Sequence, residues 1–336
     1  MKAAFGAIDM ARHQKGLRNA VSRRTVCYAL LLSLILISIL WQFLEVQISL
    51  GAEAVAARLT GKPFNQVQIL DEQGIPVQIY QDGTRSYNPL FIARDAQLEY
   101  ASDTPRFDAL IAKLMETMVV TDSTAFAPYD FDYPKYSQTA PWYSALTQAV
   151  VMNAFALAAE KYQNPAYQDL AEKLIHTLQP GRLTYALPDS SLWFMEYPAS
   201  PPYFSLSGMI STLRELNEYY QLTKDERALE LFDRGYKAVI QKLPEYDYHG
   251  YSYYNLRGVK VGRLYHNHHI QRLKELIAIR PHPLLEYYHE RWQKADRLPV
   301  LWQFIVNPRP KRIVGFLGTW LMLFCLCYFC LRLWHR

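Results

Sequence analysis

Three tyrosine-rich segments contain most of the side chains in this chain that could do chemistry. They begin near Tyr129, Trp193 and Tyr246, in a sequence of 336 residues with 25 tyrosines and 14 glycines. Tyrosine rings stack on the faces of sugars and their hydroxyl groups hydrogen-bond, so these segments indicate a carbohydrate groove. Composition leaves an alternative equally open, namely that long loops need aromatic side chains to pack onto the helices beneath them.

Carboxylates and histidines in the same segments allow two further kinds of site. Asp130, Asp132 and Glu196 could include the acid pair of a glycoside hydrolase, although carboxylates at this spacing are common on solvated loops. The histidines of Tyr265-His-Asn-His-His269 could ligate a metal. Because no Cys or Asp motif accompanies them, we expect no metal site here.

Charge divides between the tails and the middle of the chain. Residues 51–305 hold 25 of the 36 Lys and Arg and 29 of the 31 Asp and Glu, so their net charge is about −4. The overall charge of +5 therefore comes from the tails. Because no basic face shows in the middle region, we expect no nucleic-acid partner. Neither GxGxxG nor GxxxxGK[ST] occurs, which disfavours a fold that cradles phosphates.

One local basic cluster stands out in the third segment. Its members are Arg257, Lys260, Arg263 and His266. It lies close in sequence to two tyrosines, Tyr254 and Tyr265. The ordinary pKa of tyrosine is about 10, so a tyrosine can act as a base only beside cations that stabilise its phenolate. The cluster therefore favours an anionic substrate.

Two apolar segments are long enough to cross a membrane. Val26–Leu44 and Ile313–Leu331 each run for about 19 residues without a charge, enough to span ~30 Å of hydrocarbon. A signal peptide is disfavoured for the first, because its apolar core would be about 7–15 residues. The first segment is preceded by basic residues that include Arg12, Lys15, Arg18, Arg23 and Arg24. They predict a cytoplasmic N-terminus, with residues 51–305 on the other side.

The cysteines and the lack of sequons bear on the compartment. All four cysteines lie within the apolar segments, and the sequence has no N-x-[ST] motif. Secreted animal domains usually have disulfides or sequons. We therefore expect a two-pass protein of a bacterial inner membrane, with its large domain facing the periplasm, in preference to the Golgi lumen.

Apolar spacing in the middle region predicts helices in antiparallel pairs. After a hairpin at Val67–Ile69 and Val77–Ile79, a helix begins behind Asp103 or Thr104, with Pro105 in its first turn. A second pair is predicted at Trp142–Lys161 with Pro165–Leu178. A third pair joins Ser205–Leu222 to a helix that runs to Leu243 and begins with a capping box at Thr223. A fourth pair is predicted at about His269–Ile279 with Pro283–Lys294.

Three long connections alternate with the tight ones. They are Val120–Pro141, Gln179–Phe204 and Leu243–His268, each beyond the ~12–15 residues above which an unstructured loop usually has a function. An (α/α) toroid places alternate connections on one rim, where they would line a common cleft. We therefore predict an all-α (α/α) toroid or barrel with a short N-terminal β-hairpin, flanked by two transmembrane helices.

The three long connections resemble segments of D-glucuronyl C5-epimerases. The strongest match is Trp193-Phe-Met-Glu-Tyr-Pro-Ala-Ser-Pro-Pro-Tyr-Phe-Ser-Leu-Ser-Gly208, similar to their E-Y-P-x-x-P-x-x-F-x-L-x-G segment. The other matches are Tyr253-Tyr-Asn-Leu-Arg257 with I-Y-D-L-R, Tyr265-His-Asn-His-His-Ile270 with Y-H-x-x-H-I, Tyr129-Asp-Phe-Asp-Tyr-Pro134 with F-D-Y-P, Pro141-Trp-Tyr-Ser-Ala-Leu-Thr-Gln148 with W-Y-S-A-x-x-Q, and Arg291-Trp292 with R-W. Matched segments run in the family's order over roughly residues 85–295.

This resemblance implies a helical domain that converts D-glucuronate to L-iduronate within a heparan-type polymer. The catalytic positions implied are Glu196, Tyr197, Tyr254 and Tyr265, and Arg257 is implied to hold the uronate. Further substrate contacts are expected from Trp142, Tyr143, Gln148, Tyr133, His269 and Arg263. The domains expected are a cytoplasmic basic tail at 1–24, a transmembrane helix at 25–45, a linker with the hairpin at 46–100, the helical catalytic domain at 101–298, a transmembrane helix at 313–331 and a short tail at 332–336.

The implied reaction sets the chemistry that the site must provide. One group takes the C5 proton from one face of the sugar and another returns a proton to the opposite face. An arginine paired with the substrate carboxylate stabilises the enolate-like charge. Neither a metal nor another cofactor is required. The expected partners are an anionic uronate polysaccharide and the membrane, with polysaccharide synthesis or export machinery and a second copy of the chain as further candidates.

The sequence also departs from the family. Animal members carry β-rich domains ahead of the helical one, whereas residues 60–100 have room for a hairpin, and Asn255 replaces the usual Asp. The second apolar span is not a trait of the family. Two alternative functions stay open, a polysaccharide lyase or hydrolase on the same fold and a non-catalytic polysaccharide-binding subunit.

Overall fold

The computed structural model describes residues 2–61, 67–80, 83–102 and 104–334 of the chain. They belong to two compact units, one made of Met1–Val55 with Arg297–Arg336 and the other of Ala56–Asp296. The prediction of a mostly helical chain is confirmed. Asp103, one of the two predicted caps, lies outside the described residues.

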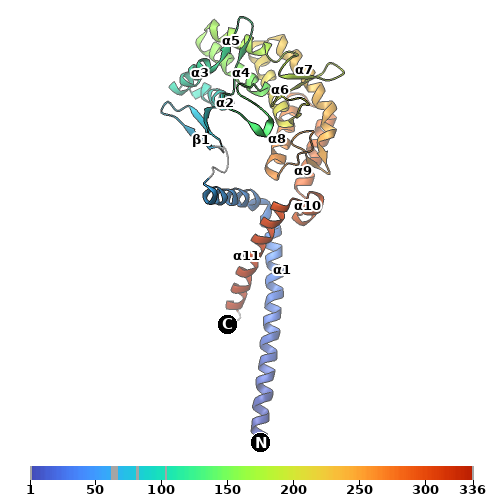
Figure 1. Ribbon diagram of the computed structural model, residues 1–336. Helices are drawn as coiled ribbons and strands as arrows, with labels where there is room; N and C mark the ends of the chain where they lie inside the picture. Colours follow the sequence, from blue (N-terminus) through green and yellow to red (C-terminus); the bar gives the residue numbers. More distant parts are fainter. Residues whose placement is uncertain (1, 62–66, 81–82, 103, 335–336) are drawn as a thin grey trace. The chain divides into compact units, whose positions relative to one another are not determined.

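Helices α2 to α9 of the second unit form four consecutive helical hairpins (Figure 1). The hairpins are α2 (Pro89–Glu99) with α3 (Pro105–Thr117), α4 (Ala145–Tyr162) with α5 (Pro165–His176), α6 (Leu206–Thr223) with α7 (Glu226–Lys242), and α8 (Arg263–Ile279) with α9 (Pro283–Asp296). The first helix of each hairpin also contacts the first helix of the next, so α2, α4, α6 and α8 follow one another through the unit. Residues from Ala145 to Ala156 of α4 are buried throughout, as expected for a helix covered by α2, α5 and α6.

Local signals explain where these helices begin. Asn88 caps α2 by accepting a hydrogen bond from the Leu90 amide at 3.0 Å, and Pro89 takes the first position, where no amide hydrogen is needed. This helix lies in the stretch that was predicted to hold only a linker and a hairpin. The predicted capping box at Thr223 is wrong, because Asp225 caps α7 and Thr223 ends α6. Helix α8 begins at Arg263, ahead of the predicted His269.

Short strands occupy the long connections and the start of the unit. The predicted hairpin is present as β1 (Val67–Leu70) and β2 (Pro76–Ile79), and β3 (Arg85–Tyr87) adds a third antiparallel strand. Gly74 makes the turn, with a φ of +77° that favours glycine. Each long connection contains a two-stranded ribbon: β4 (Val119–Val120) with β5 (Ala125–Phe126), β6 (Thr184–Ala186) with β7 (Leu192–Phe194), and β8 (Asp247–Tyr248) with β9 (Tyr251–Ser252). The connections also contain two short helices, η2 (Pro134–Tyr136) and η3 (Leu243–Tyr246).

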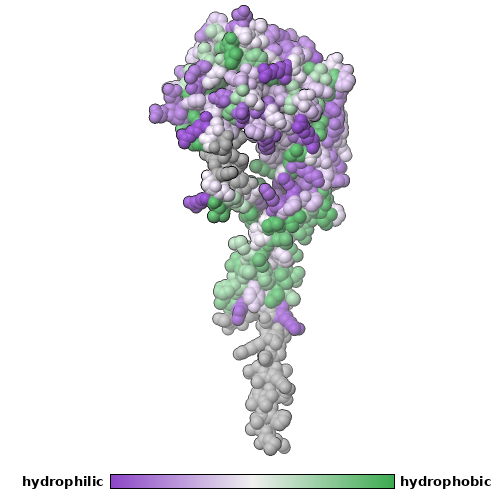
Figure 2. All heavy atoms as spheres, viewed as in Figure 1, coloured by the Kyte–Doolittle hydropathy of each residue, from purple (hydrophilic) through white to green (hydrophobic). Residues whose placement is uncertain are grey.

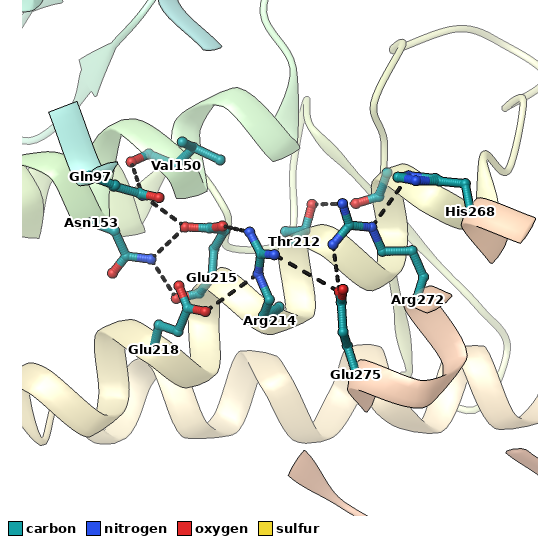
Figure 3. Close-up of polar contacts among 11 residues, drawn as sticks. Gln97, Val150, Asn153, Thr212, Arg214, Glu215, Glu218, His268, Arg272 and Glu275 are labelled. Atoms are coloured by element: carbon teal, nitrogen blue, oxygen red, sulfur yellow. Dashed lines mark hydrogen bonds and ion pairs between the residues drawn. The ribbon is translucent and has the colours of Figure 1, made fainter. Parts of the chain in front are cut away.

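A buried polar network joins α2, α4, α6 and α8 (Figure 3). The fully buried Glu215 accepts hydrogen bonds from Gln97 at 3.0 Å and Asn153 at 2.9 Å, and it pairs with Arg214 at 2.6 Å. From Arg214 the network continues through Glu275 to Arg272 and His268 on α8. Because a carboxylate stripped of these partners would stay buried and unpaired, the network ties the four helices to one arrangement.

The first unit holds the two apolar segments. They lie in α1 (Lys2–Thr60) and α11 (Pro310–Trp334), and the short α10 (Val300–Val306) precedes α11. Within the described residues, both long helices are apolar and long enough to cross a membrane. Figure 2 shows hydrophobic side chains over much of the coloured part of these helices. Trp41 of α1 contacts the edge of Phe316 at 5.3 Å between ring centres, and Arg312 bonds to Glu45 at 2.7 Å.

Candidate active site

A cavity of about 290 Å³ lies among the long connections and the helices of the second unit. Helices α2, α6 and α8 and all the resembling segments except Arg291-Trp292 contribute to its wall. Its lining residues are Tyr80, Asn88, Leu90, Phe91, Arg94, Tyr129, Tyr133, Lys135, Tyr136, Trp142, Ser144, Leu146, Glu196, Tyr197, Ser207, Gly208, Ser211, Tyr254, Tyr265 and His268. All four residues expected at catalytic positions, Glu196, Tyr197, Tyr254 and Tyr265, are among them.

Glu196 follows β7 and reaches the first turn of α6. Its Oε2 accepts a short hydrogen bond from the Ser205 hydroxyl. Gly208 leaves room for the carboxyl group, because a Cβ at this position would come within 2.5 Å of Oε2. Burial raises the pKa of Glu196, and hydrogen bonds from Ser205 and Tyr197 oppose the rise. A carboxylate with a raised pKa is a stronger base than one in water, which suits it to remove a proton.

Tyr254 lies near Ser205, whose hydroxyl bonds to Glu196. The hydroxyls of Ser205 and Tyr136 lie close enough to affect the pKa of Tyr254, which Ser205 lowers and Tyr136 raises. The Tyr254 ring meets that of Tyr265 edge to face, with ring centres 5.7 Å apart. The backbone fixes Tyr254 as well, since its carbonyl accepts from the Leu206 amide at 3.3 Å. Glu196, Ser205 and Tyr254 therefore form one connected set where two long connections meet at the start of α6.

The tyrosines of the cavity are held in their protonated form. Burial raises the pKa of Tyr254, Tyr197 and Tyr265, and the charge of Glu196 raises each of them further. Burial also raises the pKa of Tyr136 to about 12. The expectation that cations lower a tyrosine pKa is therefore not met in this cavity. Protonated phenols beside a basic carboxylate make the tyrosines suitable proton donors.

An aromatic wall extends from the cavity. Tyr197 stacks on Tyr136 with ring centres 3.7 Å apart, and Tyr129 stacks on Trp142 at 4.0 Å. Trp142 is fixed by a bond from its indole nitrogen to the Phe131 carbonyl at 2.9 Å. Flat, rigid faces of this kind suit the apolar face of a sugar ring.

Arg94 and Lys135 bring positive charge to the cavity. Arg94 projects from α2, is half-buried, and makes no hydrogen bond or ion pair within the described part of the chain. Burial lowers its pKa while Glu215 raises it, and a guanidinium stays charged under such shifts. Burial and Arg272 lower the pKa of His268, so this ring lines the cavity as a neutral group. Sequence reasoning missed Arg94, Lys135, Tyr136 and Ser205.

Some of the residues expected to bind substrate line the cavity and others do not. Trp142 and Tyr133 line the cavity. Tyr143 is not among the lining residues, and Arg182 lies over its ring at 5.0 Å. Gln148 is buried and holds both backbone groups of Ala127 at 2.9 and 3.0 Å, which fastens the first long connection to α4. The structure thus gives Tyr143 and Gln148 supporting contacts outside the lining.

The expected cations of the third segment do not line the cavity. Arg257 bonds to the Pro201 carbonyl at 2.5 Å and lies over the ring of Tyr203 at 3.6 Å. Arg263 forms an ion pair with Asp296 at 2.8 Å, and Lys260 lies over Tyr248 at 3.7 Å. The cluster therefore does not form the anion site that its sequence suggested.

His266 and His269 are not among the residues that line the cavity, and both bond to Ser252. His266 accepts from the Ser252 amide at 3.1 Å, and Nδ1 of His269 is 2.8 Å from the Ser252 hydroxyl. Burial lowers the pKa of His266 to about 4 and that of His269 to about 3, so both rings are neutral. In the described part of the chain, no group of three or more His, Cys, Asp or Glu residues is placed to hold a metal ion.

The acid pair of a glycoside hydrolase is not assembled. Asp130 bonds to the Ser86 hydroxyl, and Asp132 accepts from the Ala140 amide at 2.9 Å. Neither lines the cavity, where Glu196 is the single carboxylate among the described lining residues. Hydrolysis by two opposed carboxylates therefore has no basis in this cavity.

Residues 121–294 match the family model of the D-glucuronyl C5-epimerase C-terminus, which covers the three long connections, and the chain belongs to this family. An uncharacterized protein of Methanocaldococcus jannaschii is 28% identical over 174 residues, covering 49% of this chain and 56% of that protein. The D-glucuronyl C5-epimerase of Caenorhabditis elegans is 25% identical over 173 residues, covering 45% of this chain and 28% of that protein. The matches thus span 56% and 28% of these relatives' lengths.

Solved structures give weaker similarities. The α-mannanase of Bacteroides thetaiotaomicron has a TM-score of 0.41 at 13% identity, covering 76% of this chain and 72% of that chain. The cellobiose 2-epimerase of Spirochaeta thermophila has a TM-score of 0.40 at 15% identity, covering 61% of this chain and 54% of that chain. Scores at this level bear neither on substrate nor on mechanism.

Proposed function

We propose that the protein is a uronyl C5-epimerase that converts D-glucuronate units to L-iduronate within a polysaccharide. The observation that carries the proposal is the meeting of Glu196, Tyr254 and Arg94 around one cavity. They provide a base, a proton donor and an unpaired cation. Membership of the C5-epimerase family supports the same reaction.

Arg94 holds the carboxylate of the uronate in this proposal. Removing the C5 proton moves negative charge onto the carboxylate, which becomes enolate-like. A guanidinium that already pairs with both carboxylate oxygens stabilises this charge, and Lys135 adds to the positive field. The Arg94 guanidinium can make these bonds without giving up any protein partner in the described structure.

Glu196 and Tyr254 carry the two proton transfers. Glu196 takes the C5 proton from one face of the sugar, and the C–H electron pair enters the enolate. Tyr254 then gives its phenolic proton to C5 from the opposite face, which inverts the centre. Tyr197 bonds to Glu196, and Tyr265, half-exposed at the mouth, covers the sugar. No metal or redox cofactor takes part in this route.

Arg257 contacts the polymer outside the cavity in this proposal. The ring of Tyr203 links Arg257 to Tyr136 at the cavity wall, at 3.6 Å on one side and 5.5 Å between rings on the other. A neighbouring sugar of the chain would lie along this track. We also infer that the four hairpins form part of an (α/α) toroid and that Ala56–Asp296 faces the non-cytoplasmic side, where a polymer is made or exported.

Incubation with heparosan tests the function. We expect iduronate to form in the polymer without any change in chain length, measured by disaccharide composition and size exclusion. An unsaturated, ultraviolet-absorbing uronate would identify a lyase, and shortened saturated chains would identify a hydrolase. Binding of the polymer with no chemical change would leave a non-catalytic assembly subunit.

A further inference from the structure

Ser205 stands at the start of α6. It is the N-cap residue, yet its side chain caps no amide of the helix. An N-cap serine normally accepts a hydrogen bond from the first turn, which is worth ~1 kcal/mol. Ser205 instead donates to Glu196, while only 3% of its surface is exposed. Its hydroxyl also lies close enough to Tyr254 to lower the pKa of that phenol. The helix therefore forgoes a cap in favour of a buried hydroxyl between the two groups proposed to transfer protons.

The proposed reaction leaves these two groups in the wrong protonation states. After one epimerisation Glu196 holds the proton taken from C5, and Tyr254 has lost the proton that it donated. A second turnover in the same direction requires both to be reset. Both line a cavity walled by aromatic rings.

We propose that Ser205 returns the proton from Glu196 to Tyr254 after each turnover. This inference rests on the proposed epimerase function. The Glu196 carboxylic acid gives its proton to Oγ of Ser205, while the Ser205 hydroxyl proton passes to the phenolate of Tyr254. One O–H bond breaks and one forms at Ser205, so its hydroxyl is regenerated. The net change is Glu196 as carboxylate and Tyr254 as phenol, ready for the next sugar.

The surroundings hold Ser205 between its two partners. Gly208 lets the Glu196 carboxyl group lie against the first turn of α6, where Ser205 is placed. On the other side, the bond from the Leu206 amide fixes the backbone of Tyr254 next to the same turn. A single hydroxyl that accepts from one group and donates to the other is the smallest relay that can join them.

The test compares many turnovers with a single turnover in the full-length protein. Epimerisation of heparosan is followed with substrate in excess and again with enzyme in excess over uronate sites. For Ser205→Ala we expect the steady-state rate to fall about 10- to 100-fold, and the single-turnover rate to fall much less. The remaining steady-state rate should rise with the concentration of a small buffer such as imidazole, which can carry the proton instead. Ser205→Thr, which keeps the hydroxyl, should restore most of the rate.

Control variants keep the outcomes distinct. Ser191→Ala removes another buried serine hydroxyl, one bonded to Asp189 outside the cavity, and should change neither rate. If Ser205→Ala does not fold, Ser205→Cys keeps the volume with a weak donor and should show the same buffer dependence. Equal losses in both regimes, or a full steady-state rate without buffer dependence, would overturn the relay. A wild-type protein with no C5 exchange would instead reject the epimerase function itself.

Discussion

Gly208 lies directly against the carboxyl group of Glu196, so the first turn of α6 and the proposed base share one space. An added Cβ would come within 2.5 Å of Oε2 and 2.9 Å of Cδ. A helical glycine usually costs stability, and here its absence of a side chain is what lets the carboxyl group reach the cavity.

Gly208→Ala should therefore displace Glu196 and damage activity more than stability. We expect a loss of about 100-fold in kcat, because misplacement of a reacting group by ~1 Å has an effect of this size. Steady-state epimerisation and thermal unfolding together measure it. Gly181→Ala serves as the matched control, since a Cβ there meets only the Gln179 carbonyl at 3.8 Å. Equal activity of the two variants would contradict the placement of Glu196.

Arg94→Ala should lower kcat/KM by about 10²–10³-fold, because it removes the cation proposed to stabilise the enolate. Arg94→Lys should recover part of this loss, since lysine keeps the charge without the two-pronged geometry. The control is Arg182→Ala, which removes an exposed arginine stacked on Tyr143 outside the cavity. Normal kinetics for Arg94→Ala would exclude Arg94 from the carboxylate site.

Arg257→Ala should act on polymer binding and leave the chemical step nearly unchanged. Its guanidinium lies over Tyr203, outside the cavity, so a long chain should lose a contact that a short fragment never makes. We expect KM to rise several-fold for heparosan and to stay constant for a tetrasaccharide, measured by initial rates. A large fall in kcat for both substrates would instead place Arg257 at the reacting sugar.

The pH dependence of kcat/KM should show an acid limb set by Glu196. The active form has Glu196 as carboxylate and Tyr254 as phenol, so activity rises with pH through the raised pKa of Glu196 and is lost only above the ordinary tyrosine range. The bond from Tyr197 stabilises the carboxylate and lowers this pKa. Tyr197→Phe should therefore move the acid limb to higher pH. A shift to lower pH would be inconsistent with that bond.

Glu218 gives the network of Figure 3 a pH-dependent effect on stability. Burial and the nearby Glu215 raise the pKa of Glu218 to about 7. The folded pKa exceeds the unfolded one, so the contribution of Glu218 is fully present below pH ~4.5 and is lost as pH rises through about 7. Glu218→Gln should raise the melting temperature at pH 8 and give no gain at pH 4. Glu230→Gln, on the more exposed face of α7, should show no such difference between the two pH values.

The helical hairpins could be predicted from the sequence, because apolar spacing and Asn–Pro or Asp caps are signals contained within each helix and its first turn. The four residues that the resemblance implies as catalytic, Glu196, Tyr197, Tyr254 and Tyr265, lie in matched motifs, and all four line the cavity. Arg94 could not be found in this way. The Asn88–Pro89 start of α2 was readable, but the approach of α2 to α4 is a long-range contact.

Arg257 illustrates the opposite failure. Its motif and its charge both favoured a place beside the substrate carboxylate. The structure satisfies its guanidinium locally, with the Pro201 carbonyl and the face of Tyr203. A charge counted along the sequence does not reveal such local partners. Arg94, which has no hydrogen-bond or ion-pair partner among the described residues, is recognisable only once the cavity is known.

Proton exchange at C5 tests the central claim most directly. Purified wild-type protein and Glu196→Gln are incubated with heparosan in D2O, and the uronate C5 position is followed by NMR. The account predicts deuterium at C5 together with iduronate signals for the wild type, and loss of both for Glu196→Gln. Absence of exchange by the wild type with every uronate polymer offered, or undiminished exchange by Glu196→Gln, would contradict it.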